Sequence, residues 1–173
     1  MNSRSIVLLA SAAVLLSLSS VAQTKSGSTA ASLPAAHHLA VRPEAVRWTP
    51  MSSDLMEGTP AFALTEPPQV SLLEGDPSQA GAPFTLRIRL AAGTRVPPHW
   101  HPTEEHITVL QGRFSLGMGD EYNAASLQEL PTGSYASMPK GMTHFALATG
   151  DTIVQVHGVG PFKSVWVGSG QSR

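Results

Sequence analysis

The chain has 173 residues, a formal net charge of −1 and no cysteine. A nearly neutral chain without a cluster of Lys or Arg is not suited to bind nucleic acid or an anionic membrane surface, so we expect neither as a partner. The absence of cysteine excludes disulfides, thiolate nucleophiles and redox dithiols, and the fold must therefore depend on its hydrophobic core.

Residues 1–22 have the features of a Sec-type secretory signal peptide. Arg4 supplies a positive charge, residues 6–18 form an apolar run too short for a comfortable membrane span, and small residues up to Ala22 permit cleavage before Gln23. An uncleaved N-terminal anchor is the alternative. We expect a periplasmic or secreted protein that has no membrane association after cleavage.

The rest of the chain predicts a disordered linker, a single all-β domain and a short tail. Residues 23–40 are polar and rich in small residues, 41–69 form an N-terminal arm, 70–168 form the domain and 169–173 the tail. Short apolar or alternating runs between Gly and Pro turns predict strands and no helix. The expected strands span 70–74, 84–90, 105–116 through a turn at 111–112, 134–138, 143–148, 152–157 and 165–167. Many short strands of this kind indicate a sandwich or barrel.

Four residues form a candidate metal site: His99, His101, Glu105 and His144. The first three are separated by even numbers of residues, so on a strand they would share one face, while His144 must come from another strand. Three imidazoles and a carboxylate make a full ligand set for one divalent transition metal, either Fe, Mn, Ni, Cu or Zn. Octahedral iron or manganese would keep open positions, whereas tetrahedral zinc would be closed.

The four candidate ligands belong to two sequence groups that also contain turn residues, Gly in both and Pro in the second. The groups are Gly93, His99, His101, Glu105 and Gly112, and then Gly133, Pro139, Gly141 and His144. This pattern resembles the two sequence motifs of the cupin superfamily nearly position for position. One departure is Ala148, where the second motif often ends in Asn, a position that is usually structural and not a ligand.

The resemblance implies a double-stranded β-helix, also called a jelly-roll barrel, in which the four residues bind the metal. Because cupins commonly pair their barrels, and because the arm at 41–69 could cross to a neighbour, we expect a homodimer. The family includes dioxygenases, isomerases and decarboxylases as well as ligand-binding modules, so the resemblance alone does not select a reaction.

Strand parity predicts which side chains line a pocket beside the metal. Ile107, Val109 and Gln111 should point inward with Glu105, and Met142 and Ala146 should point inward with His144. This lining is largely apolar, which suits a small organic ligand.

Gln155 and His157 have two possible roles, because they share one face of a late strand while Val154 and Val156 share the other. If the valines pack outside, Gln155 and His157 could support the metal ligands or supply a general base. If the valines face the core, which the burial of apolar side chains favours, both polar residues are solvated.

Two functions are compatible with these observations. The first is a mononuclear metal-dependent, dioxygenase-like enzyme that acts on a small organic molecule, with the catalytic residues beyond the ligands unknown. The second is a non-catalytic cupin that binds or senses a small ligand or a metal, in which the metal is structural.

Overall fold

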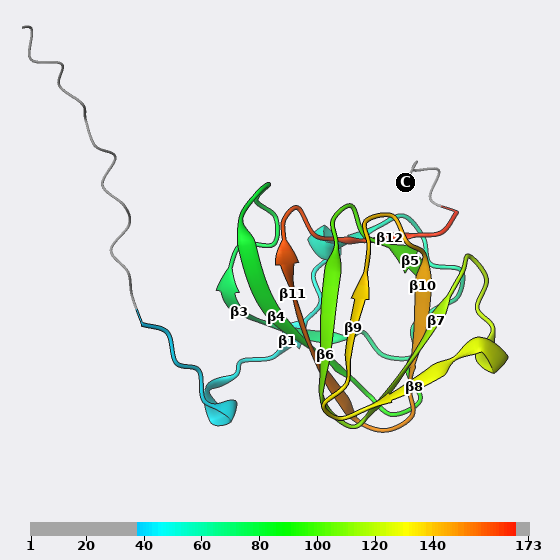
Figure 1. Cartoon of the computed structure of the whole chain (residues 1–173), viewed down its shortest axis with the longest axis horizontal. Coiled ribbons are helices and arrows are strands. Elements are labelled where there is room, and N and C mark those ends of the chain that lie inside the picture. Colours follow the sequence, from blue (N-terminus) through cyan, green and yellow to red (C-terminus); the bar gives the residue numbers. More distant parts are fainter. Residues whose placement is uncertain (1–37, 169–173) are drawn as a thin grey trace, which may run out of the picture. The chain divides into compact units, whose positions relative to one another are not determined.

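Two six-stranded sheets form a jelly-roll barrel in the computed structural model, which describes residues 38–168 (Figure 1). The first sheet has the order β1 (Thr49–Pro50), β3 (Gln69–Gly75), β4 (Pro83–Leu90), β11 (Thr152–Val159), β6 (Glu105–Gln111) and β9 (Tyr135–Met138). The second has the order β2 (Met56–Glu57), β12 (Ser164–Trp166), β5 (Arg95–Trp100), β10 (His144–Ala148), β7 (Arg113–Met118) and β8 (Gln128–Pro131). The predicted all-β jelly-roll class is confirmed.

The core lies between the two sheets and follows the alternation read from the sequence. In β4, Phe84 and Leu86 are 2% and 1% exposed, and in β11 Val154 and Val156 are equally buried. Phe114 of the second sheet belongs to the same cluster. The apolar side chains of β4 and β11 face inward together because these strands pair in antiparallel register, with Leu86 opposite Val156.

The strand β5, which contains Pro97 and Pro98, was not among the strands that the sequence predicted. Proline lacks the donor that a strand ladder needs and is normally confined to edges or bulges. The ladder between β5 and β10 is irregular here, since its register shifts between His144 and Ala146. The short strands β1, β2 and β8 were also not predicted.

The sequence also predicted no helix, and residues 38–168 contain three single 3₁₀ turns. They are η1 (Pro43–Ala45), η2 (Ser53–Leu55) and η3 (Ala124–Ser126). Ser52 and Asn123 cap the second and third turns by accepting hydrogen bonds from the backbone N–H groups of Asp54 and Ala125. Among the described residues, no helix is long and apolar enough to cross a membrane.

The N-terminal arm packs on the barrel of its own chain. Its strand β1 pairs antiparallel with β3, and β2 pairs in parallel with β12. The guanidinium of Arg89 lies 4.1 Å from the centroid of the Trp48 ring, and that of Arg95 lies 4.9 Å from the Phe62 ring. Contacts of this kind contribute roughly 0.5–1 kcal/mol each at exposed sites, so they hold the arm at two places.

Three regions of the predicted organisation lie outside the described residues. They are the signal peptide at 1–22, the linker up to residue 37 and the tail at 169–173. The described part of the chain therefore comprises the end of the linker, the arm and the barrel.

Gly117 in β7 gives a test of the packing on the second sheet. A Cβ atom at this position would lie 2.3 Å from the ring of Phe145, a side chain that is fully buried. We predict that Gly117→Ala lowers the free energy of unfolding by about 1–3 kcal/mol, because the ring must shift within a packed core. Urea denaturation measures this change.

Gly150→Ala is the matched control, since a Cβ at Gly150 has no neighbouring atom within 4 Å. Equal stability of the two variants would contradict the packing that we describe around Phe145.

Candidate metal centre

The two sheets together supply the four predicted ligands. His99 in β5 lies directly opposite His144 in β10, and both strands belong to the second sheet. His101 follows the end of β5, while Glu105 begins β6 in the first sheet. The site thus forms where the second sheet approaches the start of β6, and all four side chains are at most 6% exposed.

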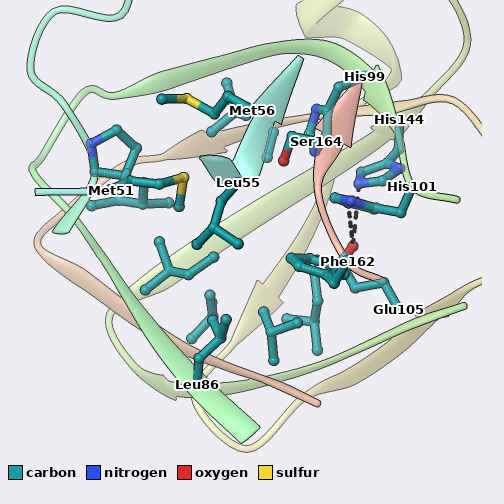
Figure 2. A pocket seen from close by; sticks show the side chains of 18 of the residues that line it. Met51, Leu55, Met56, Leu86, His99, His101, Glu105, His144, Phe162 and Ser164 are labelled. Atoms are coloured by element: carbon teal, nitrogen blue, oxygen red, sulfur yellow. Dashed lines mark ion pairs between the residues drawn. The ribbon is translucent and has the colours of Figure 1, made fainter. Parts of the chain in front are cut away.

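The side chains converge on one point (Figure 2). The ring nitrogens that the three histidines offer lie within 4.8 Å of one another, so this group could hold a metal ion. Glu105 Oε2 lies 3.2 Å from His101 Nε2 and 3.3 Å from His144 Nε2. The structure therefore brings together all four residues that the sequence selected.

Backbone carbonyl groups orient all three imidazole rings. The Nδ1 atoms of His99, His101 and His144 donate to the carbonyl oxygens of Pro97, Lys163 and Met142 at 2.8, 2.8 and 3.1 Å. A carbonyl oxygen can only accept, so each Nδ1 carries a proton. In the neutral ring the Nε2 atom then has a free lone pair, which is the form that binds metals.

The arrangement fits a cation because, with the rings in their neutral form, the imidazole nitrogens and the carboxylate all offer lone pairs to the centre. His101 Nε2 and Glu105 Oε2 are buried and have no hydrogen-bond donor. Buried polar atoms without a partner are costly, and lone pairs that face one another repel. A divalent metal ion would satisfy the three Nε2 atoms and the carboxylate at the same time, and this donor set suits a transition metal.

The pKa values of the two groups with clear shifts match this role. Burial lowers the pKa of His99 well below its usual value, and the neighbouring His144 and His101 lower it further. Burial alone would raise the pKa of Glu105, but His101 and His144 outweigh this effect and hold that pKa well below its usual value. At neutral pH, His99 is therefore neutral and Glu105 is ionised, as metal ligands must be.

Two aromatic side chains that the sequence did not single out pack against the ligands. The ring of Phe162 stacks on His101 with centroids 4.5 Å apart, and the ring of Trp166 meets His99 edge-on at 5.4 Å. Both rings shield the centre from water. A sequence signal existed, because Phe162, Ser164 and Trp166 are spaced two apart and all three line the pocket beside the metal centre.

A cavity of about 60 Å³ adjoins the ligands. Apolar side chains from both sheets and from the N-terminal arm form most of its wall. Of the predicted lining residues, Ile107 and Ala146 take part, whereas Val109 is buried in the core and does not reach the cavity.

Gln111 and Met142 correct the predicted lining. The register between β6 and β11 shifts between Ile153 and Val154, which breaks the alternation that the prediction assumed. Gln111 is exposed and borders a separate hollow on the surface. Met142 is 41% exposed and lies in the turn before β10, where strand parity does not apply, although its carbonyl oxygen orients His144.

Gln155 and His157 lie on the outer face of the first sheet, so they do not support the metal ligands. Val154 and Val156 face the core, which is the interpretation that the burial of apolar side chains favoured in the sequence. The side chain of Gln155 accepts a hydrogen bond from Arg87, and the ring of His157 stacks on that of His106 with centroids 4.8 Å apart.

Comparison with known proteins agrees with this geometry. The family described as the ChrR cupin-like domain matches residues 36–163. The chain belongs to this family. The resemblance of its two motifs to the cupin superfamily is thereby confirmed, and the four predicted ligands, His99, His101, Glu105 and His144, all lie inside the matched region.

Curated relatives and solved structures support the same fold. Germin-like protein 2-4 of rice is 39% identical over 79 residues, which cover 45% of this cupin and 34% of the plant protein. Germin-like protein subfamily 3 member 2 of Arabidopsis thaliana is 33% identical over 94 residues, which cover 49% and 41%. This cupin thus spans well under half the length of either relative.

An acetylacetone dioxygenase from Acinetobacter johnsonii superposes with a TM-score of 0.53 at 13% identity, covering 75% of this cupin and 77% of that chain. A putative acetylacetone dioxygenase from Methylibium petroleiphilum gives the same TM-score at 18% identity, covering 75% and 81%. At these identities the likeness shows the fold alone.

The lowered pKa of His99 predicts how the metal-free protein responds to acid. Below about pH 6.5 the unfolded chain protonates this histidine while the folded chain keeps it neutral, so the unfolded chain binds more protons. The free energy of unfolding should fall as the pH drops, by about 1.4 kcal/mol per pH unit for each proton of difference. The contribution of Glu105, whose pKa is also lowered, is lost at a still lower pH.

Urea denaturation in the presence of a chelator, repeated across this pH range, measures the slope. His99→Asn should make the slope shallower. An unchanged slope in His99→Asn would contradict the buried, neutral state of this ring.

Proposed function

We propose that this cupin binds one divalent transition metal ion through His99, His101, Glu105 and His144, and that it uses the metal in a dioxygenase-like reaction on a small organic molecule. The observation that carries the proposal is the convergence of four buried acceptor atoms beside an apolar cavity. A site with a structural role alone needs no adjoining cavity.

The residues around the centre have separate tasks in this proposal. The three carbonyl hydrogen bonds fix the orientation of the imidazole rings, so that their Nε2 atoms point to the ion. Glu105 contributes one negative charge, which offsets half of a divalent charge. A bound metal of this type would supply Lewis-acid or redox chemistry at the coordination positions that the protein leaves open.

The protein around the cavity controls what reaches the centre. Phe162 and Trp166 keep water away from the ligands, and the apolar wall holds the organic part of a substrate. Apart from the four ligands, none of the described residues that line the cavity is titratable. Proton transfer would therefore involve the ligand set or the substrate itself, and the further polar side-chain groups among the described lining residues are the hydroxyl of Ser164 and the indole N–H of Trp166.

Metal content tests the ligand assignment. The protein purified without a histidine tag should hold about one metal ion per chain by elemental analysis, because the buried donors form a complete set. His99→Ala and His144→Ala should each weaken metal binding by more than about 100-fold, since a lost ligand costs more than a lost supporting group. Electron paramagnetic resonance identifies the metal if it is paramagnetic.

His157→Ala is the matched control, because this half-buried histidine lies on the outer face of the same barrel. Retention of the metal by His99→Ala, or its loss from His157→Ala, would contradict the assignment. Iron or manganese in the wild-type protein would justify a screen for oxygen uptake.

Zinc would instead favour the second candidate function, a non-catalytic cupin that binds a ligand or a metal. The cluster of three histidines and one carboxylate supports this alternative equally well when zinc closes the site in tetrahedral geometry. Absence of a free coordination position, together with a large fall in melting temperature on chelation, would establish the structural role.

We also propose that the protein is exported and that its mature form is a homodimer. The charged, apolar and small residues up to Ala22 support export, and the mature chain should begin at Gln23. The intact mass of the protein recovered from outside the cytoplasm tests the cleavage position, and an unprocessed mass would contradict it.

Light scattering at micromolar concentration tests the homodimer, which a monomer mass would refute.

A further inference from the structure

We infer that the cavity selects ligands with a single polar end, bound at the metal centre, and an uncharged apolar body. This inference rests on the proposed function, since the polar end requires the metal. It names a substrate class and excludes molecules that carry a second charged group away from the metal.

The wall of the cavity is the first observation. Apart from the four ligands, Ser164 and the indole N–H of Trp166, the side chains of the described residues that line it are apolar. The first sheet contributes Leu86, Ile88, Leu90, Ile107, Val154 and Val156. No lysine or arginine is among the described lining residues, so a distal carboxylate or phosphate would find no counter-charge.

The cations nearest to this wall are directed elsewhere, which is the second observation. Arg87 donates to Gln155 on the outer face of the first sheet, and Arg89 lies over the ring of Trp48. Lys163 forms an ion pair with Glu57 of the arm. These three positive charges are therefore already engaged outside the cavity, and none of the three can turn inward without the loss of a contact.

The arm is the third observation, because it builds the part of the wall away from the metal. Met51, Leu55, Met56 and Leu64 of the arm all line the cavity. Figure 2 shows Met51 and Leu86 at the opposite side of the pocket from the histidines, where the far end of a bound ligand would lie. The end that would meet a second polar group is thus closed by thioether and aliphatic side chains.

The size and surroundings of the cavity should make the affinity for a ligand with a second charged group much lower than for one without it. A space of about 60 Å³ admits a few water molecules, too few to keep a second charged group solvated. Burial of an unpaired charge is among the most costly events in a protein interior. We expect a distal carboxylate to weaken binding by at least about 100-fold relative to a methyl group at the same place.

The pair 2-oxopentanoate and 2-oxoglutarate tests this inference. Both compounds present the same oxo acid to a metal and differ only at the far end, which is a methyl group in one and a carboxylate in the other. Isothermal titration calorimetry of the metal-loaded protein without oxygen measures both affinities and needs no turnover. The expected result is tight binding of 2-oxopentanoate and weak or undetectable binding of 2-oxoglutarate.

A variant that adds a cation extends the test. Met51→Arg places a guanidinium at the far end of the cavity and should raise the affinity for 2-oxoglutarate by at least about tenfold while it weakens binding of 2-oxopentanoate. Leu72→Arg is the matched control, because Leu72 is 52% exposed and does not line the cavity. It should bind both compounds as the wild-type protein does.

The metal content of the same samples separates the two proposals. A protein that takes up no metal refutes the proposed function, and this inference fails with it. A protein that holds the metal but binds both compounds equally, prefers 2-oxoglutarate or binds neither refutes the inference alone. The wild-type comparison decides the matter even if Met51→Arg does not fold.

Discussion

The whole site depends on one close approach: a buried carboxylate at the start of a strand in one sheet lies 3.2–3.3 Å from two imidazole nitrogens held by the other sheet. Closure of the barrel forces these acceptors together, and backbone carbonyl groups prevent the rings from turning their N–H groups inward. A cation placed between these atoms would contact the carboxylate and the imidazole nitrogens at the same time. The pairing of the strands, and not flexible loops, therefore sets the geometry of the candidate metal site.

Much of the candidate metal site could be predicted from the sequence, because side chains alternate strictly along a strand where its pairing with the neighbouring strand is regular. His99, His101 and Glu105 share parity, and Ile107 continues it into the cavity. The same rule failed at Gln111, since the irregular register between β6 and β11 interrupts the alternation. A bulge depends on how two strands that are distant in the sequence pair with each other, so no local pattern in the sequence predicts it.

The remaining misses concern contacts between segments far apart in the chain. Phe162 and Trp166 have the right spacing for one face, but only the pairing of β12 with β5 shows that this face covers the histidines. The arm between residues 41 and 69 gave no strong signal of its own, because β1 and β2 have two residues each and form only against the barrel. Short edge elements of this kind depend on tertiary contacts for their structure.

Lys163 joins two parts of the molecule that would otherwise be independent. Its carbonyl oxygen accepts from Nδ1 of His101, and its ammonium group pairs with Glu57, while the next residue, Ser164, lies opposite Met56 in the parallel ladder. Lys163 therefore contributes both to the docking of the arm and to the orientation of His101, a predicted metal ligand. A change that displaces Lys163 would therefore disturb the docking of the arm and the orientation of the His101 ring together.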